Sequence, residues 1–186
     1  SIRGAAVTSI KIEGITHEFS SIPGVIEDVT EIILNIKQLA LKLNDVESTK
    51  IQINAKGPKE IKAADIDCGA HVEVLNKDLH ICTLDSKANV NIILTVEEGK
   101  GYVPAVKHNN SGDAPLGTIF IDSFFSPVRR VSFRVENSRV GQVTDYDKLI
   151  MNIETNGSVV PEDSVAFAAR IIDEQLKMFI NFEEPV

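Results

Sequence analysis

Cysteine is scarce in this sequence, and long apolar runs are absent. Cys68 and Cys82 are the only cysteines among 186 residues. Their spacing fits neither a metal knuckle nor a redox pair, and two cysteines do not make a disulfide scaffold, so we expect two reduced thiols. No apolar stretch approaches the roughly 18 residues that cross a bilayer, and no basic, apolar leader opens the chain. We therefore expect a soluble, unexported, cytoplasmic protein with no membrane partner.

Positive charge is also in short supply. Lysine and arginine together number 19 against 27 aspartates and glutamates, which gives a net charge of −8. A protein that binds nucleic acid by itself usually presents a basic surface, because phosphate neutralisation supplies most of the affinity. This balance argues against direct DNA binding by the chain. Otherwise the composition, with 43% hydrophobic and 25% charged residues, is that of a globular protein long enough to bury a core.

The common sequence motifs of catalysis are missing as well. There is no G-x-S-x-G elbow, no Walker loop and no G-x-G-x-x-G. The Asp145–Asp147 pair is more typical of a turn than of an acid–base pair. His80 and Cys82 would share one strand face, but two ligands do not make a metal site. The four histidines are scattered and lack metal-site spacing: His17, His71, His80 and His108. We predict no catalytic residue, no metal and no cofactor.

Two segments show the apolar period of a helix. The first, at about 25–38, has a polar face that includes Glu27 and Lys37. The second, at about 161–180, begins at Pro161, where a missing N–H costs nothing, and follows a turn predicted at Asn156–Gly157. Their apolar faces include Val29, Ile32, Ile33 and Ile36 in the first helix and Ile172, Leu176 and Phe179 in the second.

Alternation of apolar and polar residues dominates the rest of the chain and predicts strands. The predicted strands are 7–14, 39–43, 50–54, 71–76, 80–84, 89–99, 117–124, 128–136 and 148–155, and the predicted loops are 55–60, 103–117 and 137–147. Such alternation favours antiparallel sheets with one solvated face. We therefore predict an α+β fold with mainly antiparallel sheets, in which a β-rich block interrupts a subdomain that contains the two long helices.

Three stretches in this order resemble the N-terminal domain of the α subunit of bacterial-type DNA-directed RNA polymerase. They are "IPGVIEDVTEIILNIK" at 22–37, "GKGYVPA" at 99–105 and "TDYDKLIMNIETNG" at 144–157. The resemblance extends over essentially the whole chain. Each stretch alone is a weak signal, but their combination at this spacing is specific.

The resemblance implies a scaffold that carries out no chemistry itself. In the family, a dimerising α+β subdomain is interrupted by an inserted β-rich subdomain, and the α dimer is the platform for the two large catalytic subunits of a nucleotidyltransferase. It implies a homodimer in the full-length protein, located in the bacterial cytoplasm or its organellar equivalent. The inserted subdomain would span 44–126; residues 1–3 and 127–186 would form the dimerising subdomain, which shares the helix region 4–43.

The resemblance also suggests contact residues. Lys37, at the end of the first helix, and Ile121 with Asp122 occupy positions where the family contacts a large subunit, and Arg129 and Arg130 are plausible additions. Lys37 at a solvated helix end and Ile121 in a core strand are the alternatives. The helix residues would form the dimer seam or pack the helices: Val29, Ile32, Ile33, Ile36, Ile172, Leu176 and Phe179.

Two expectations concern the limits of the resemblance. The family has a further strand and helix before the position of Ser1, and a linker and DNA-binding domain after the position of Val186, so we expect this chain to be a fragment. A different class of protein stays open: a small α+β ligand-binding protein or enzyme in which the 103–117 loop closes over a pocket.

Overall fold

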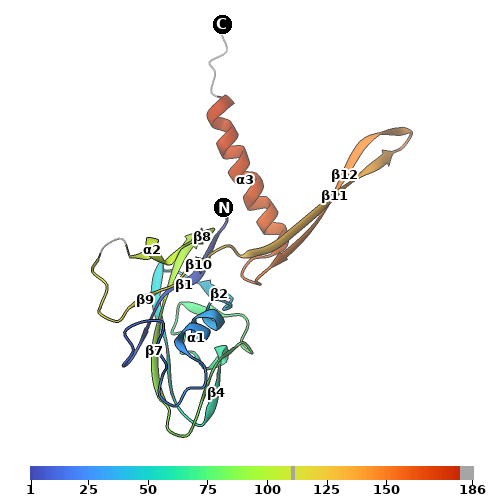
Figure 1. The fold of residues 1–186 in the computed structure, drawn as a ribbon. Coiled ribbons are helices and arrows are strands. Elements are labelled where there is room, and N and C mark those ends of the chain that lie inside the picture. Colours follow the sequence, from blue (N-terminus) through green and yellow to red (C-terminus); the bar gives the residue numbers. More distant parts are fainter. Residues whose placement is uncertain (110–111, 181–186) are drawn as a thin grey trace. The chain divides into compact units, whose positions relative to one another are not determined.

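The computed structural model describes residues 1–109 and 112–180 and confirms the predicted α+β class (Figure 1). The chain divides into two compact units. Unit 1 comprises Ser1 and Arg3–Ser126, and unit 2 comprises Ile2 and the chain from Pro127 onward. Every strand pairing in the described residues is antiparallel. The sheets therefore have the arrangement that the alternation predicts.

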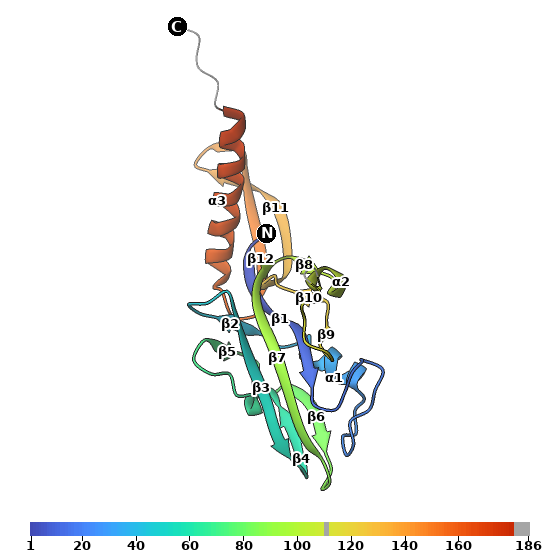
Figure 2. The ribbon, with the colours of Figure 1, turned by 90° about the vertical axis from the view of Figure 1, so that its left-hand side faces the viewer.

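Unit 1 is built mainly of strands. It contains β1 (Arg3–Ile12), α1 (Val29–Ile36), β2 (Leu41–Leu43), β3 (Ser48–Lys56), β4 (Lys59–Lys62), the 3-10 helix η1 (Ala63–Asp65), β5 (Val72–Val74), β6 (His80–Leu84), β7 (Asn89–Lys100), β8 (Tyr102–Val103), α2 (Ala105–His108), β9 (Ile119–Phe120) and β10 (Ser123–Phe124). The main sheet has the order β3-β7-β1-β2-β5, with β9 also paired to β1. Figure 2 shows β3, β7 and β1 lying side by side.

The core of unit 1 follows from alternation along these strands. In β7, every second side chain from Val90 to Val96 is buried, and Ile51 and Ile53 of β3 lie beside them. The apolar face of α1 joins the same core, and α1 lies against β6. Because the sheet and the helix each have one apolar face, one core covers both.

The start of α1 differs from the predicted 25–38. The helix begins at Val29 because Asp28 is its N-cap: the Glu31 backbone N–H donates to the Asp28 carboxylate at 2.8 Å. Val25 pairs with Leu84 instead of entering the helix. Glu27, expected on the polar face, is only 8% exposed because its carboxylate is bonded to β6.

Removing the N-cap should weaken unit 1. We expect Asp28→Ala to lower the free energy of unfolding by about 1 kcal/mol, because a backbone N–H in the first turn loses its acceptor. Asp28→Asn keeps an acceptor and should leave the stability nearly unchanged. Chemical denaturation of both variants measures the effect, and equal losses would show that capping is not the cause.

One strand prediction and one loop prediction in unit 1 are corrected. The predicted strand 117–124 is two short strands, because β9 pairs with β1 whereas β10 pairs with β8. The predicted loop 55–60 contains the start of β4, which pairs with β6. Both errors have the same origin: the partner of a short strand is not visible in its own sequence.

Unit 2 contains β11 (Val128–Val140), β12 (Val143–Thr155) and α3 (Pro161–Ile180). The predicted loop 137–147 is wrong, because the ladder continues to the Val140–Val143 pair and turns over Gly141, whose φ is 64°. The side chain of Asp145, one of the two acids considered above, lies outside the described residues. The predicted bounds of the last helix, 161–180, are confirmed.

Candidate functional site

The described residues contain no group of three or more histidine, cysteine, aspartate or glutamate side chains able to hold a metal ion. Cys82 is fully buried, and burial raises the pKa of its thiol to about 12, so it remains a neutral core side chain. The ring of His80 is bonded to carboxylates. Among the described helices, none is long and apolar enough to cross a membrane.

A small cavity in unit 1 collects several of the residues suggested by the sequence. Its volume is about 210 Å³, and it lies beside the last turn of α1 and the strands β1, β8 and β10. Its lining is partly apolar and includes one ion pair: Ala6, Val7, Ile36, Lys37, Leu39, Tyr102, Asp122, Ser123 and Phe124. The cavity is smaller than the roughly 300–1,000 Å³ of typical small-molecule sites.

Asp122 is the polar centre of this site. Its Oδ1 accepts the backbone N–H of Ala105 at 2.8 Å, which fixes the start of α2, and its Oδ2 lies 3.5 Å from the Lys37 ammonium. The Ala105 N–H lowers the pKa of Asp122 most; partial burial opposes this, and Lys37 lowers the pKa further. Asp122 is therefore an ionised carboxylate that joins two elements far apart in sequence.

An aromatic pair lies at the same cavity. The ring centroids of Tyr102 and Phe124 are 5.2 Å apart, and both side chains are more exposed than buried. Exposed aromatic side chains next to a charged pair are typical of protein–protein contacts, where aromatics act as anchors. Neither residue was predicted to belong to a site. Ser123 and Phe125 are buried on either side of Phe124, so Phe124 points outward, and a polar side chain on the buried face hides this in the sequence.

The other suggested contact residues lie elsewhere. Ile121 is only 3% exposed, and its backbone N–H donates to the Thr8 carbonyl, so its side chain belongs to the core, as the alternative stated. Arg129 and Arg130 lie on β11 in unit 2 and are exposed, and Arg130 is paired with Glu154 at 3.0 Å. Only Lys37 and Asp122 are brought together.

The suggested seam residues divide into two groups. Val29, Ile32, Ile33 and Ile36 are at most 5% exposed and serve packing within unit 1. A seam residue must be accessible in the single chain, so for these four the burial agrees with the packing half of the prediction. On α3 the opposite holds, because the helix buries only Ser164 and exposes Ile172, Leu176 and Phe179.

Residues 10–126 match the family described as the RNA polymerase Rpb3/RpoA insert domain. This match covers well over half of the chain and ends at the residue where unit 1 ends. The chain therefore belongs to this family of RNA polymerase subunits, and the resemblance to the N-terminal domain of an α subunit is confirmed. Membership places it among the α-type subunits of the transcription enzyme, which assemble with other polymerase subunits.

Proposed function

We propose that this chain is a non-catalytic assembly scaffold that dimerises through unit 2 and presents unit 1 to a large catalytic subunit. The observation that carries the proposal is the uncovered apolar surface of α3. A helix of 20 residues that buries a single side chain gains little from its own chain, because most helical stability comes from packing an apolar face. A partner for that face is therefore required.

A second copy of the chain is the proposed partner for α3. Ile172, Leu176 and Phe179 are 60%, 52% and 76% exposed, and they are spaced to lie on one face. A two-fold symmetric contact lets the same apolar patch serve both copies, and permanent homodimers bury largely apolar surface. In this proposal 1–3 and 127–186 form the dimerising subdomain, which shares the helix region 4–43, and 44–126 form the inserted subdomain; the helix region itself lies in unit 1.

The surface around Lys37, Asp122, Tyr102 and Phe124 is the proposed contact with a large subunit. It combines two exposed aromatic side chains with a partly solvated ion pair, so it offers both an apolar anchor and a charged rim. Arg129 and Arg130 are a second, more polar contact in the same proposal. Glu154 beside Arg130 offsets one of the two positive charges of that patch.

Reversing the charge of Lys37 should weaken the contact. Lys37→Glu would replace the ammonium beside Asp122 by a second carboxylate, which reverses the charge that this surface offers to a large subunit. We expect about a tenfold loss of affinity for the large subunit, or about 1.4 kcal/mol. Surface plasmon resonance, with the wild type and the variant passed over an immobilised large subunit, measures this affinity.

Lys50→Glu is the matched control, because it makes the same charge change at an exposed position of β3. If both variants lost the same affinity for the large subunit, net charge would be the cause, and the proposed contact would be contradicted. Tyr102→Ala removes an aromatic anchor without changing charge and should also weaken binding, by roughly 1–2 kcal/mol.

The ligand-binding alternative gains no support from a specific observation. Residues 105–108 of the predicted covering loop form α2, whose start is fixed by the Ala105–Asp122 bond, and the cavity beside it is small. Positions 110 and 111 of that loop lie outside the described residues.

A further inference from the structure

Two segments of unit 1 lie on either side of β6. Along one edge β6 pairs with β4, and Glu60 lies opposite Thr83. Along the other edge Val25 bridges Leu84, and the Ile26 N–H donates to the Thr83 carbonyl at 3.1 Å. The segment before α1 and the β4 strand therefore flank β6 on opposite sides.

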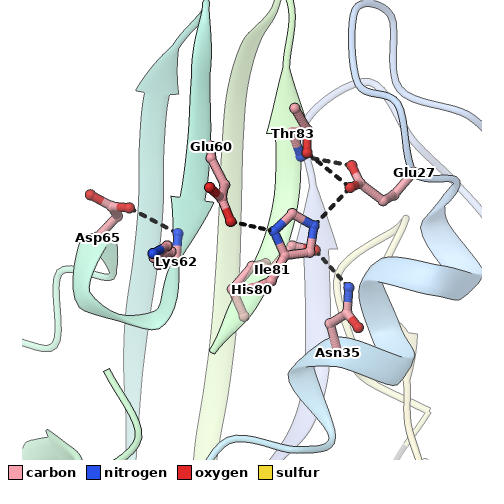
Figure 3. Close-up of polar contacts among 8 residues, drawn as sticks. All are labelled: Glu27, Asn35, Glu60, Lys62, Asp65, His80, Ile81 and Thr83. Atoms are coloured by element: carbon pink, nitrogen blue, oxygen red, sulfur yellow. Dashed lines mark hydrogen bonds and ion pairs between the residues drawn. The ribbon is translucent and has the colours of Figure 1, made fainter. Parts of the chain in front are cut away.

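The side chain of His80 spans these two sides. Figure 3 shows its ring between two carboxylates, with Nε2 2.8 Å from Glu27 Oε1 and Nδ1 3.0 Å from Glu60 Oε1. An ionised carboxylate only accepts hydrogen bonds, and a neutral imidazole donates from one nitrogen alone. Both contacts are satisfied together only when the ring is an imidazolium.

Glu27 is the fixed member of the group. Its carboxylate accepts the Thr83 backbone N–H at 2.6 Å and the Thr83 hydroxyl at 3.0 Å, and it is 8% exposed. Burial by itself would raise the pKa of Glu27, but the bonds from Thr83 and His80 outweigh burial and lower it. Glu60, by contrast, has a half-exposed side chain and can exchange His80 for water.

We propose that His80 is a proton-dependent bridge between β4 and the segment that leads into α1. With the ring protonated, Glu27 and Glu60 are both bonded. When the ring loses its proton, the remaining N–H stays on Nε2 with the buried Glu27, and Glu60 is released to solvent. The side-chain contact to β4 is then lost, whereas the contact to the segment before α1 is kept and the β4–β6 ladder stays paired.

The other charged residues near the ring lie on β4, where Lys62 is paired with His80 in the ladder. On β4, Lys59 pairs with Asp65 at 2.7 Å, and Asp65 also accepts the Lys62 backbone N–H. From α1 the residue facing this part of β6 is the uncharged Asn35, which donates to the Ile81 carbonyl at 2.9 Å. On β6 itself, the Cys82 thiol is neutral. Glu27 and Glu60 are therefore the groups that act on the charge of His80.

The pH range of the bridge follows from the directions of the two shifts. The bond to Glu27 raises the pKa of His80 above 6.5; burial opposes this, and Glu60 raises it further. The stability that protonated His80 contributes is therefore complete below pH 6.5, and it is lost as the pH rises through the raised pKa of His80. The pKa of Glu27 is lowered below 4.5, so its contribution is complete above 4.5 and is lost on acidification. The bridge is tightest between these two limits.

Proton and ¹⁵N NMR of the His80 ring in the full chain tests the proposal. We expect a His80 pKa above 6.5, which falls by about half a unit in Glu60→Gln, a roughly threefold loss of proton affinity. Glu73→Gln removes an exposed carboxylate on β5 and should leave the pKa of His80 unchanged. The ¹⁵N shifts at high pH should show the remaining proton on Nε2.

Three results would overturn the bridge. A wild-type His80 pKa at or below 6.5 would mean that the carboxylates do not favour the imidazolium. If Glu60→Gln and Glu73→Gln lowered the pKa of His80 equally, the shift would come from net charge and not from the bond to Glu60. A neutral ring protonated on Nδ1 would mean that Glu60, and not Glu27, keeps the contact.

Discussion

Leu176→Glu should dissociate the proposed dimer while leaving each copy folded. The side chain is 52% exposed in the single chain, so the substitution costs little there, but in a two-fold seam the glutamate would be buried in both copies. About half of each leucine is left to bury in the dimer, so losing both removes roughly 1.5–3 kcal/mol, before any cost of burying charge. That corresponds to roughly a 10- to 100-fold weaker dimer.

Sedimentation equilibrium of the wild type and two variants measures this effect. Met178→Glu is the control, because it also replaces an exposed apolar side chain of α3 by glutamate, but about 200° around the helix axis from position 176. A dimer lost in Leu176→Glu and kept in Met178→Glu is the expected result. If all three proteins dimerised equally, α3 would not form the dimer interface.

Leu94→Ala should cause a large loss of stability in unit 1. Leu94 is fully buried on β7, between Ile51 of β3 and Ile10 of β1. Truncating such a side chain removes apolar burial and leaves a cavity, at a cost of about 3 kcal/mol. Denaturant titration should show a correspondingly lower free energy of unfolding.

Leu34→Ala makes the same chemical change at a position of α1 that is 55% exposed. It should cost no more than about 0.5 kcal/mol, because surface changes away from special features are small. If both variants lost the same stability, the core of unit 1 would not be centred on β7.

The parts of the fold that the sequence predicts are those with a repeated pattern. The bounds of α3 follow from Pro161 and the apolar period, and β6 and β7 follow from alternation, because these signals are local. The position of β4 is not local, since it depends on pairing with β6. The start of α1 depends on Asp28 as cap and on Val25 pairing with a strand almost 60 residues away.

The candidate site shows the same limit. Lys37 and Asp122 were suggested by resemblance, but their 3.5 Å approach and the Ala105 bond belong to the fold. Tyr102 and Phe124 carry no motif that marks them as a pair, because their strands meet only through the β8–β10 ladder. In the same way, Ile121 beside Asp122 alternates into the core, which separates two neighbours that sequence reasoning treated alike.

The role of the helices could not be assigned from periodicity alone. An apolar stripe shows that a helix buries one face, and it does not show what covers that face. In α1 the cover is the chain's own core, whereas in α3 the stripe stays exposed. The burial of Ile32 and Ile36 against the exposure of Ile172 and Leu176 makes the distinction that the sequence left open.

Native mass spectrometry of the protein that carries this chain, co-expressed with the two large subunits of a bacterial-type RNA polymerase, tests the scaffold proposal most directly. The proposal predicts an assembly that contains two copies of the protein and one of each large subunit. It also predicts that Leu176→Glu abolishes this assembly, whereas Met178→Glu does not. An assembly with a single copy, or none in the wild type, would contradict the account.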